Sequence, residues 1–317
     1  MIQSPLNYTG GKYKLLPQIL PLFPKNISRF YDFFCGGCNV GINVDCDEVV
    51  CIDCEENLIY LYQTFQNLDK EEIFKWIYKI ISEYGLSLVS RNGYKFYNCE
   101  SSKGLGEYNR ESFKRLRNDF NKCKVFDYRY YVMLYVIIVY AFNNQIRFNS
   151  AGEFNLPVGK RDFNSRMHSK LLTFIDRIKS QNYKFICQDF RDFDIKELSE
   201  NDFIYADPPY LITCASYNEN GGWSDSDEID LLKFLDSINS IGIKFALSNV
   251  LHSKGKENKI LAKWLGKNSD TYQTIHLKQS YANSNYHKTD KISESEEILV
   301  VNYEVEQGQG DFLELEV

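Results

Sequence analysis

Short apolar runs alternate with amphipathic segments along most of the chain, and this alternation predicts an α/β fold. The runs of strand length that end in turn-forming or polar residues are 29–34, 49–53, 183–187, 203–206, 244–249 and 297–303. Helical spacing of apolar residues is found at 15–22, 58–84 and 225–241, the last with acidic residues at its start. We therefore expect a Rossmann-like sheet with helices on both faces.

The alternation of strand and helix stops between residues 85 and 164, where the chain becomes helical and basic. The most apolar run, 130–142, is too short to cross a membrane and predicts a buried helix. Ser150-Ala151-Gly152 separates two short alternating runs and predicts a β-hairpin. We therefore expect a mostly helical domain with a β-hairpin at 61–160, inserted into a domain formed by 1–60 and 161–317.

Composition and charge narrow the class of protein. The 317 residues, 44% of them hydrophobic, are enough for a full core in one large domain or two. The N-terminus lacks the basic and apolar regions of a signal peptide, so we expect a cytoplasmic protein with no membrane segment. The net charge of −6 argues against indiscriminate binding of polyanions. Residues 101–170 nevertheless hold 13 Lys and Arg against 6 Asp and Glu, which predicts either a phosphate-binding surface or a solvated helix face.

Nine cysteines are present, and two pairs of them have C-x-x-C spacing. These pairs are Cys35/Cys38 and Cys51/Cys54, so a zinc site is one interpretation. Both pairs lie at predicted strand ends, where ligand-binding turns explain them better, and free thiols in a reducing compartment are favoured. The four histidines show no metal spacing, and we predict no metal site.

The strongest chemical signal is Phe203-Ile204-Tyr205-Ala206-Asp207-Pro208-Pro209-Tyr210. Its first four residues predict a short buried strand, and the two prolines then fix a stiff hook at the carboxyl end of that strand. Ligands bind at this edge of an open α/β sheet. Asp207 and the Pro208 carbonyl could accept the two hydrogens of an amino group on a ring, while Tyr210 stacks on the ring. The alternative is an ordinary turn at the end of a strand.

Two glycine turns have the features of ligand-binding loops. Gly10-Gly11-Lys12 precedes a predicted helix, where backbone N–H groups and an ammonium would suit a carboxylate. Gly36-Gly37 follows the first predicted strand and would let the backbone approach a nucleotide closely. Asp53 ends the second strand at the spacing of an acid that binds ribose hydroxyls, or it caps the helix that follows. Asp189-Phe190 could place an acid and an aromatic ring beside an adenine.

The predicted hairpin carries side chains that read base edges and phosphates in nucleic-acid complexes. They include Asn144, Arg147, Asn149, Asn155, Lys160 and Arg161. A basic segment that interrupts the alternating strands and helices of a Rossmann-like domain is consistent with a nucleic-acid-binding insertion. The alternative is an ordinary surface hairpin. Two polar segments, 213–223 and 281–295, predict loops beside the site and near DNA.

Taken together, these motifs resemble the Dam-type DNA adenine-N6 methyltransferases, the class in which the cofactor motifs precede the recognition domain and the catalytic tetrapeptide follows it. The resemblance spans nearly the whole chain. It rests on Tyr8-Thr9-Gly10-Gly11-Lys12, Phe34-Cys35-Gly36-Gly37, Asp53, the hairpin from Arg147 to Lys160, and Asp207-Pro208-Pro209-Tyr210. The hairpin text Arg-Phe-Asn-x-x-Gly-Glu-Phe-Asn-Leu-Pro-Val-Gly-Lys is close to that of the family and is specific.

The resemblance implies S-adenosylmethionine as the cofactor and double-stranded DNA as the substrate, with transfer to N6 of a flipped adenine. It assigns catalysis to Asp207, Pro208, Pro209 and Tyr210. It assigns cofactor binding to Tyr8, Gly10, Gly11, Lys12, Phe34, Gly36, Gly37, Asp53, Asp189, Phe190 and Asp207. Domain 61–160 becomes the DNA-recognition domain, with Arg147 and Asn149 in the recognition hairpin and Lys160 and Arg161 on phosphates. A cognate restriction endonuclease is an expected partner unless the enzyme is an orphan methylase.

Two departures from the family pattern affect what can be expected. Cys38 stands where the family has the last glycine of its Phe-x-Gly-x-Gly turn, so we expect a slightly shifted turn. The segment 281–291 is longer and more polar than in the compact GATC enzymes, which leaves the recognition sequence open. The alternative functions are an RNA adenine or other amino-methyltransferase and a non-catalytic DNA-binding regulator of the same fold.

Overall fold

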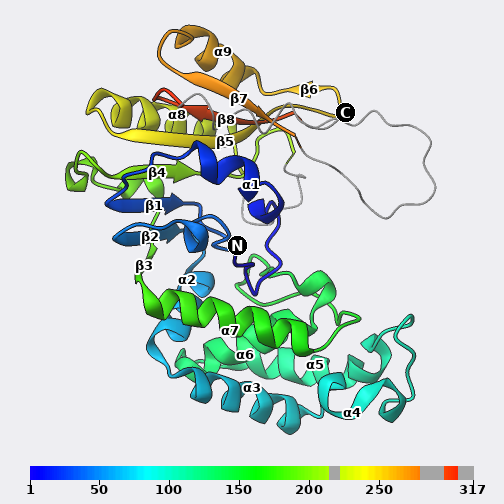
Figure 1. The fold of residues 1–317 in the computed structure, drawn as a ribbon. Coiled ribbons are helices and arrows are strands. Elements are labelled where there is room, and N and C mark those ends of the chain that lie inside the picture. Colours follow the sequence, from blue (N-terminus) through cyan, green and yellow to red (C-terminus); the bar gives the residue numbers. More distant parts are fainter. Residues whose placement is uncertain (214–221, 279–295, 306–317) are drawn as a thin grey trace, which may run out of the picture. The chain divides into compact units, whose positions relative to one another are not determined.

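The computed structural model describes residues 1–213, 222–278 and 296–305, and the chain forms two compact units (Figure 1). The first unit comprises Met1–Gly11, Gly36–Ile42 and Glu55–Cys187. The second comprises Lys12–Cys35, Asn43–Cys54 and Gln188–Val317. Most of the predicted loop 213–223 and all of the predicted loop 281–295 lie outside the described residues.

A mixed β-sheet forms the second unit. Its strands are β1 Arg29–Phe33, β2 Glu48–Asp53, β4 Phe203–Ala206, β5 Lys244–Ser253, β6 Lys256–Glu257, β7 Gln273–Leu277 and β8 Glu296–Val301. The strand order within this unit is β2-β1-β4-β5-β8-β7, with β6 paired to β5. β2, β1, β4 and β5 are parallel, whereas β8 is antiparallel to both β5 and β7. The carboxyl ends of the four parallel strands therefore meet at one edge.

Aromatic packing covers both faces of this sheet. On one face, Phe23 packs against Phe30, Phe203 and Tyr205. Phe23 directly follows two short helices, α1 Leu16–Ile19 and the 3-10 helix η2 Leu20–Leu22. On the opposite face, Phe33 packs against Phe234 of α8 Asp225–Ser240. Alternate residues of a strand point to opposite faces, so these two sets cannot share a side. The prediction of a Rossmann-like sheet with helices on both faces is confirmed.

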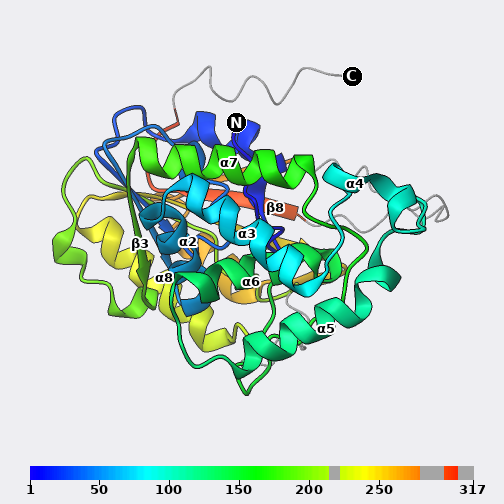
Figure 2. The same cartoon turned by 90° about the horizontal axis from the view of Figure 1, so that it is seen from below.

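The first unit is mostly helical (Figure 2). It contains α2 Glu56–Asn67, α3 Lys70–Tyr84, α4 Val89–Phe96, α5 Gly106–Lys122, α6 Tyr128–Tyr140, α7 Ser165–Ser180 and β3 Asn182–Cys187. Residues 130–140 of α6 are all buried, and α6 packs against α2, α3 and α5. This confirms the buried helix expected from the most apolar run. It ends at Tyr140 because Ala141 adopts an extended conformation.

Several element boundaries differ from the predictions. The predicted helix 58–84 is two helices, because Leu68 and Asp69 are extended between α2 and α3. The hairpin around Ser150–Gly152 pairs through isolated antiparallel bridges, Phe148 with Phe154 and Ala141 with Val158, rather than through regular strands. Helix α9 Lys259–Lys267 and strand β7 were not predicted. Helix α9 has nine residues and β7 five, so each offers only a short pattern, and tertiary packing contributes to their conformation.

Candidate active site

The Asp-Pro-Pro-Tyr hook stands at the carboxyl end of β4. All four residues of β4 are buried, as the apolar run predicts. The backbone N–H of Asp207 donates to the Phe33 carbonyl at 3.3 Å, which ties the hook to the end of the neighbouring strand β1. Pro208 is buried, Pro209 is exposed and Tyr210 is half-buried. The hook is therefore fixed by the sheet on one side while part of it reaches the surface.

Lys12 lies against this hook with its side chain buried. Its Nζ is 2.7 Å from Asp207 Oδ1 and 2.8 Å from Oδ2, and 3.5 Å from Glu297 Oε1. The side chain of Glu297, at the start of β8, is only 4% exposed. One buried ammonium therefore faces two carboxylates, one from each side of β5 in the strand order.

Tyr210 joins the same cluster through its hydroxyl. This oxygen lies 3.0 Å from Asp207 Oδ1, 2.9 Å from Glu297 Oε1 and 3.2 Å from Ser248 Oγ. Lys12 Nζ lies 4.8 Å from the centre of the Tyr210 ring, within the range of a cation–π contact. The ring is thus held at its hydroxyl end and covered on one face.

Burial dominates the electrostatics of the cluster. It raises the pKa of Asp207 above its ordinary value, and Lys12 opposes that rise. Burial likewise raises the pKa of Glu297, with Lys12 opposing and Asp207 adding to the rise. Burial also holds the pKa of Tyr210 well above its ordinary value, so this residue remains a neutral phenol at neutral pH.

The other predicted cofactor residues of the second unit gather near the ends of β1 and β2. Phe34, with a φ of +60°, packs against Phe190 and Trp223, with ring centres 5.5 Å away in each case. Asp53 is buried at the end of β2, and its carbonyl accepts from the Gln188 N–H at 3.1 Å. The structure therefore brings Asp53 into contact with the segment that carries Asp189 and Phe190. An aromatic wall next to a buried acid fits an adenosine.

Asp189 has a further role that the sequence did not indicate. Its Oδ1 accepts from the N–H of Arg191 at 2.8 Å and caps the 3-10 helix Phe190–Asp192. The Arg191 guanidinium pairs with Asp189 at 3.0 Å and lies over the Phe190 ring at 4.5 Å. These contacts fix the orientation of Phe190.

In the first unit, the glycine turn is built around Tyr8. Gly36 has a φ of +45°, and a Cβ there would lie 2.8 Å from Cδ1 of Tyr8. The Gly36 carbonyl accepts from the Tyr62 hydroxyl at 2.7 Å. Gly10 has a φ of +80° with open space where a Cβ would be. Only glycine provides this combination of backbone conformation and close approach, which fits a turn that a ligand approaches closely.

Cys38 also takes a positive φ, +53°. It stands where the resembled family has glycine, and the turn keeps the left-handed conformation that glycine adopts most easily. Cys35, Cys38 and Cys51 are buried and Cys54 is exposed, and none of these four described residues forms a disulfide. Across the described parts of the chain, no group of three or more His, Cys, Asp or Glu could hold a metal ion.

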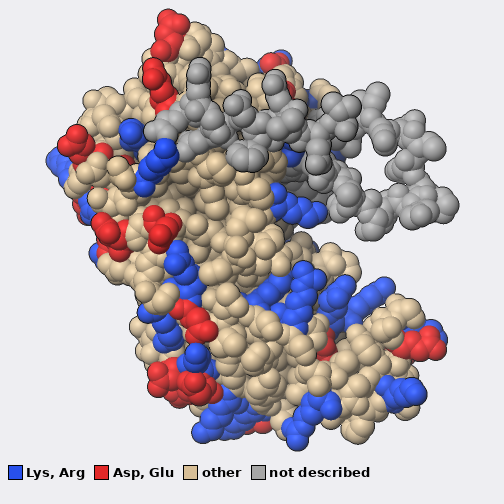
Figure 3. Space-filling model, viewed as in Figure 1, with Lys and Arg blue, Asp and Glu red and all other residues tan. Residues whose placement is uncertain are grey.

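The predicted DNA-binding residues all lie in the first unit, around the hairpin. Asn149 Oδ1 accepts from the N–H groups of Ala151 and Glu153, and Asn144 Nδ2 donates to the Val139 carbonyl, so both side chains stabilise the local backbone. Arg147 Nε donates to Asn155 Oδ1 at 2.7 Å, while the arginine itself is exposed. Lys160 and Arg161 are exposed as well. Lys and Arg side chains gather on the face of this unit shown in Figure 3.

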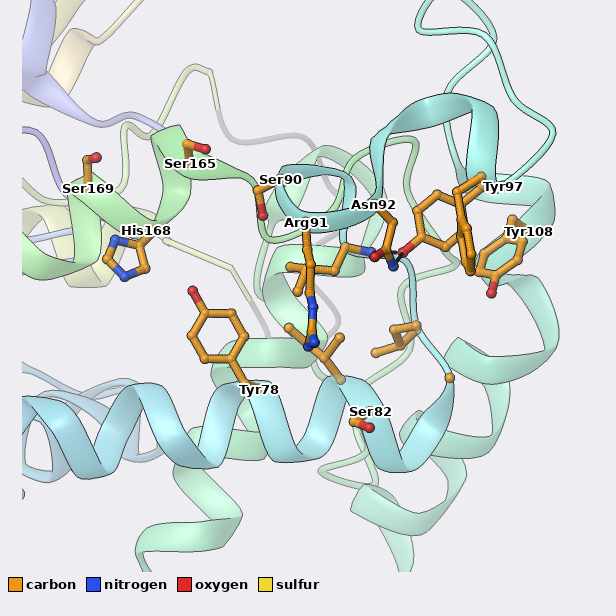
Figure 4. A pocket seen from close by; sticks show the side chains of 15 residues that line it. Tyr78, Ser82, Ser90, Arg91, Asn92, Tyr97, Tyr108, Ser165, His168 and Ser169 are labelled. Atoms are coloured by element: carbon orange, nitrogen blue, oxygen red, sulfur yellow. Dashed lines mark hydrogen bonds between the residues drawn. The ribbon is translucent and has the colours of Figure 1, made fainter.

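A separate hollow of about 830 Å³ lies in the first unit among α3, α4, α5 and the start of α7 (Figure 4). Arg91, Tyr78, Tyr97, Tyr108 and His168 contribute to its lining. Among the described residues that line it, none is Asp or Glu. This hollow therefore lacks the carboxylate that the chemistry at the hook requires, and the second unit remains the candidate active site.

Two residues of the buried cluster were missed in the sequence. Glu297 precedes the apolar run Ile298–Val301, and Ser248 lies inside the buried strand β5. A carboxylate at the start of an apolar strand was the available signal for Glu297. Its partner could not be read from the sequence because strand order, not spacing along the chain, places β8 beside β5.

The fold and the hook define the chain as a Rossmann-like α/β protein with a Lys12–Asp207–Tyr210 cluster at the carboxyl end of β4. The profile of the D12 class N6 adenine-specific DNA methyltransferases matches residues 8–303, and the chain belongs to this family. This confirms the resemblance to the adenine-N6 enzymes that the ordered motifs indicated.

Comparison with individual proteins gives the same picture. The chain is 42% identical over 308 residues to the Type II methyltransferase M.FokI of Planomicrobium okeanokoites, covering 95% of this chain and 43% of that protein. It is 38% identical over 310 residues to the modification methylase StsI of Streptococcus sanguinis, covering 96% and 43%. It is 26% identical over 260 residues to M.MjaIII of Methanocaldococcus jannaschii, covering 77% and 83%. The chain thus spans less than half the length of the first two relatives.

Proposed function

We propose that this chain transfers a methyl group from S-adenosylmethionine to N6 of an adenine flipped out of duplex DNA. The observation that carries the proposal is the buried Lys12–Asp207–Tyr210 cluster at the carboxyl end of β4, in a chain of the D12 family. The names of its relatives, a Type II methyltransferase and a modification methylase, support a place beside a cognate restriction endonuclease. Among the described residues, no helix is both long and apolar enough to span a bilayer. We propose that the protein is bacterial or phage-encoded and acts on DNA in the cytoplasm.

The proposed chemistry rests on alignment and electrostatics. Flipping the base costs a few kcal/mol. Asp207 and the Pro208 carbonyl accept the two amino hydrogens, which favours a tetrahedral nitrogen with a free lone pair. Lys12 covers one face of the Tyr210 ring, and the opposite face stacks on the adenine. Pro209 keeps the hook rigid.

Bound S-adenosylmethionine supplies the methyl group on a positively charged sulfur. Phe34 and Phe190 would pack on its adenine, with Asp189 at the ring edge and Asp53 on the ribose. Tyr8, Gly10, Gly11, Lys12, Gly36 and Gly37 would hold the remainder. The aromatic wall of the second unit supports the adenosine part of this assignment.

Methyl transfer to defined nucleic acids tests the proposed function. The purified chain would be incubated with tritiated S-adenosylmethionine and either duplex DNA or RNA, and the methylated DNA would be sequenced with base-resolved detection of N6-methyladenine. We expect label in duplex DNA alone, at adenines in one sequence context. Label in RNA would indicate the rival amino-methyltransferase, and DNA binding without transfer in a single turnover would indicate a regulator.

The DNA-recognition role proposed for 61–160 predicts two different phenotypes. Arg147→Ala is expected to reduce discrimination against a wrong base by about 1–3 kcal/mol, because an arginine in the hairpin reads a base edge. Lys160→Ala is expected to weaken binding to all duplexes. It should also reduce the slope of log affinity against log salt concentration by about one, because one phosphate contact is lost. Both are measured as affinities for matched and mismatched duplexes over a salt series.

A charge-matched control is Lys75→Ala, which removes an exposed cation of α3 in the same unit. We expect it to leave both discrimination and salt dependence close to those of the unmodified chain. Equal effects of Arg147→Ala and Lys160→Ala on every duplex would reject the readout role of the arginine.

A further inference from the structure

Trp223 completes the aromatic wall of the second unit. Its ring centre lies 5.5 Å from that of Phe34 and 6.1 Å from that of Phe190, and these two rings are 5.5 Å apart. Phe190 is buried, with the Arg191 guanidinium 4.5 Å from its ring centre. Phe34 and Trp223 are half-buried. The surface that this wall can offer to a flat ligand therefore belongs mainly to Phe34 and Trp223, while Phe190 supports them.

Glu228 fixes the indole of Trp223. This glutamate lies near the start of α8 and is 0% exposed, and its Oε2 accepts from Trp223 Nε1 at 2.6 Å. A capping box of Ser224 and Asp227 starts α8 directly after Trp223. Trp223 and Glu228 therefore occupy the two positions at which many helices pair apolar side chains. A hydrogen bond takes the place of the apolar pair here, and it fixes the direction of the indole as well as its position.

Three donors converge on the Glu228 carboxylate. Besides the indole, Asn249 Nδ2 in β5 and Asn258 Nδ2 at the N-cap of α9 donate to Glu228 Oε1, at 3.1 and 2.7 Å. Turning either amide round would lose a second bond, because each Oδ1 already accepts from a backbone N–H, of Val250 and of Leu261 respectively. A carboxylate accepts at both oxygens, whereas a glutamine amide accepts at only one. An acidic side chain at this position can therefore accept from all three donors.

Resting on the proposed function, we infer that Trp223 contacts the adenine of S-adenosylmethionine and that Glu228 is the positioning residue that holds its indole in place. A partly exposed indole next to the Phe34 ring offers a flat apolar surface on which an adenine can stack. An apolar residue in place of Glu228 would pair with Trp223 without the cost of burying a carboxylate, so the acid is better explained by the direction that it gives to the indole. The contact involves the adenosine part, which S-adenosylmethionine shares with its by-product S-adenosylhomocysteine.

A double-variant cycle tests this inference. Glu228→Gln keeps the oxygen that accepts from the two asparagines but turns an amide NH₂ toward the indole N–H, so it breaks the bond to Trp223 alone. We expect it to lower the affinities for S-adenosylmethionine and S-adenosylhomocysteine equally, by about three- to tenfold. In a Trp223→Phe background, which lacks the N–H, Glu228→Gln should change either affinity by less than about twofold. The affinities are measured by calorimetric titration of the purified full chain without DNA.

Trp264→Phe is the matched control. The indole of Trp264, in α9, also donates to a carboxylate, since its Nε1 is 2.9 Å from Asp236 Oδ1. Its ring packs on Tyr272 and not on the aromatic wall. We expect this variant to keep both affinities close to those of the unmodified chain.

Indole fluorescence gives a second test, which holds even if the Glu228→Gln variant fails to fold. The chain has three tryptophans, so the signal is assigned by comparing variants. Adding S-adenosylhomocysteine to the unmodified chain should change the fluorescence, because an adenine then contacts an indole. The change should be lost in Trp223→Phe and retained in Trp264→Phe.

The outcomes separate this inference from the proposed function. An equal effect of Glu228→Gln with and without Trp223→Phe would indicate a merely structural role and overturn the inference. So would unchanged affinities in Glu228→Gln, a fluorescence change that survives Trp223→Phe, or failure of the unmodified chain to bind either compound. A chain that methylates DNA without these effects would keep its function and lose the role of Glu228. A chain that shows these effects but never methylates duplex DNA would support that role and refute the proposed function.

Discussion

Asp207→Ala is expected to reduce methyl transfer by about a thousandfold or more while affinity for duplex DNA changes by less than about twofold. Asp207 lies at the carboxyl end of β4, where its oxygens are 2.7 and 2.8 Å from Lys12 Nζ and one is 3.0 Å from the Tyr210 hydroxyl. The change removes the acceptor proposed for the adenine amino group and leaves the exposed cations of the first unit in place. Single-turnover transfer and equilibrium DNA binding are the two measurements.

Two further variants show whether the loss is specific to this carboxylate. Asp207→Asn keeps a hydrogen-bond acceptor but removes the charge, so we expect a substantial loss that is smaller than that of the alanine variant. Asp270→Ala removes an exposed aspartate of the same unit and should leave transfer unchanged. Near-normal turnover of Asp207→Ala would refute the assignment of the hook as the catalytic site.

Lys12→Met is expected to destabilise the fold by about 3–5 kcal/mol at neutral pH, because it removes the cation that faces the buried carboxylate of Glu297 and the largely buried carboxylate of Asp207. Lys12 is 4% exposed and lies within 3.5 Å of both Asp207 and Glu297. The same change removes one of the proposed cofactor contacts, so activity falls with stability. The measurement is the thermal unfolding midpoint of the variant and of the unmodified chain over a pH series.

The sign of the pH dependence follows from the two carboxyls. Burial raises the pKa of each above its ordinary value, and Lys12 opposes the rise, so its removal raises both pKa values further. A carboxyl whose pKa is higher in the folded state favours folding at low pH and opposes it as the pH rises through the raised pKa. The difference in midpoint should therefore be largest above the raised pKa values of the two carboxyls and shrink on acidification through them.

A compensating substitution provides the matched control. Adding Glu297→Gln to Lys12→Met leaves a single buried carboxylate and should restore part of the lost stability. A midpoint difference that is independent of pH, or a double variant less stable than Lys12→Met, would mean that packing of the lysine chain, and not its charge, stabilises the cluster.

Local patterns in the sequence predicted most of the elements around the site. The apolar run 203–206 and the two prolines after Asp207 specify a buried strand and a stiff hook. Both signals are local, because a run of apolar residues and the fixed φ of proline act within a few residues of the chain. The same holds for the strand before Gly36 and for the buried helix at Tyr128–Tyr140. Prediction was less successful for the hairpin strands and missed α9 and β7, since these short segments depend on neighbours for their conformation.

The sequence by itself determined the family, the strand that ends in Asp207, and the residue types available for a methyl-transfer site. Only the tertiary structure decided that Lys12 pairs with Asp207 across 195 residues and that Tyr210 meets Glu297 across 87. The physical reason is that the strand order places β4, β5 and β8 side by side. Burial in that sheet strengthens the interaction between charged side chains that are far apart in the sequence, and their spacing along the chain does not predict that they meet.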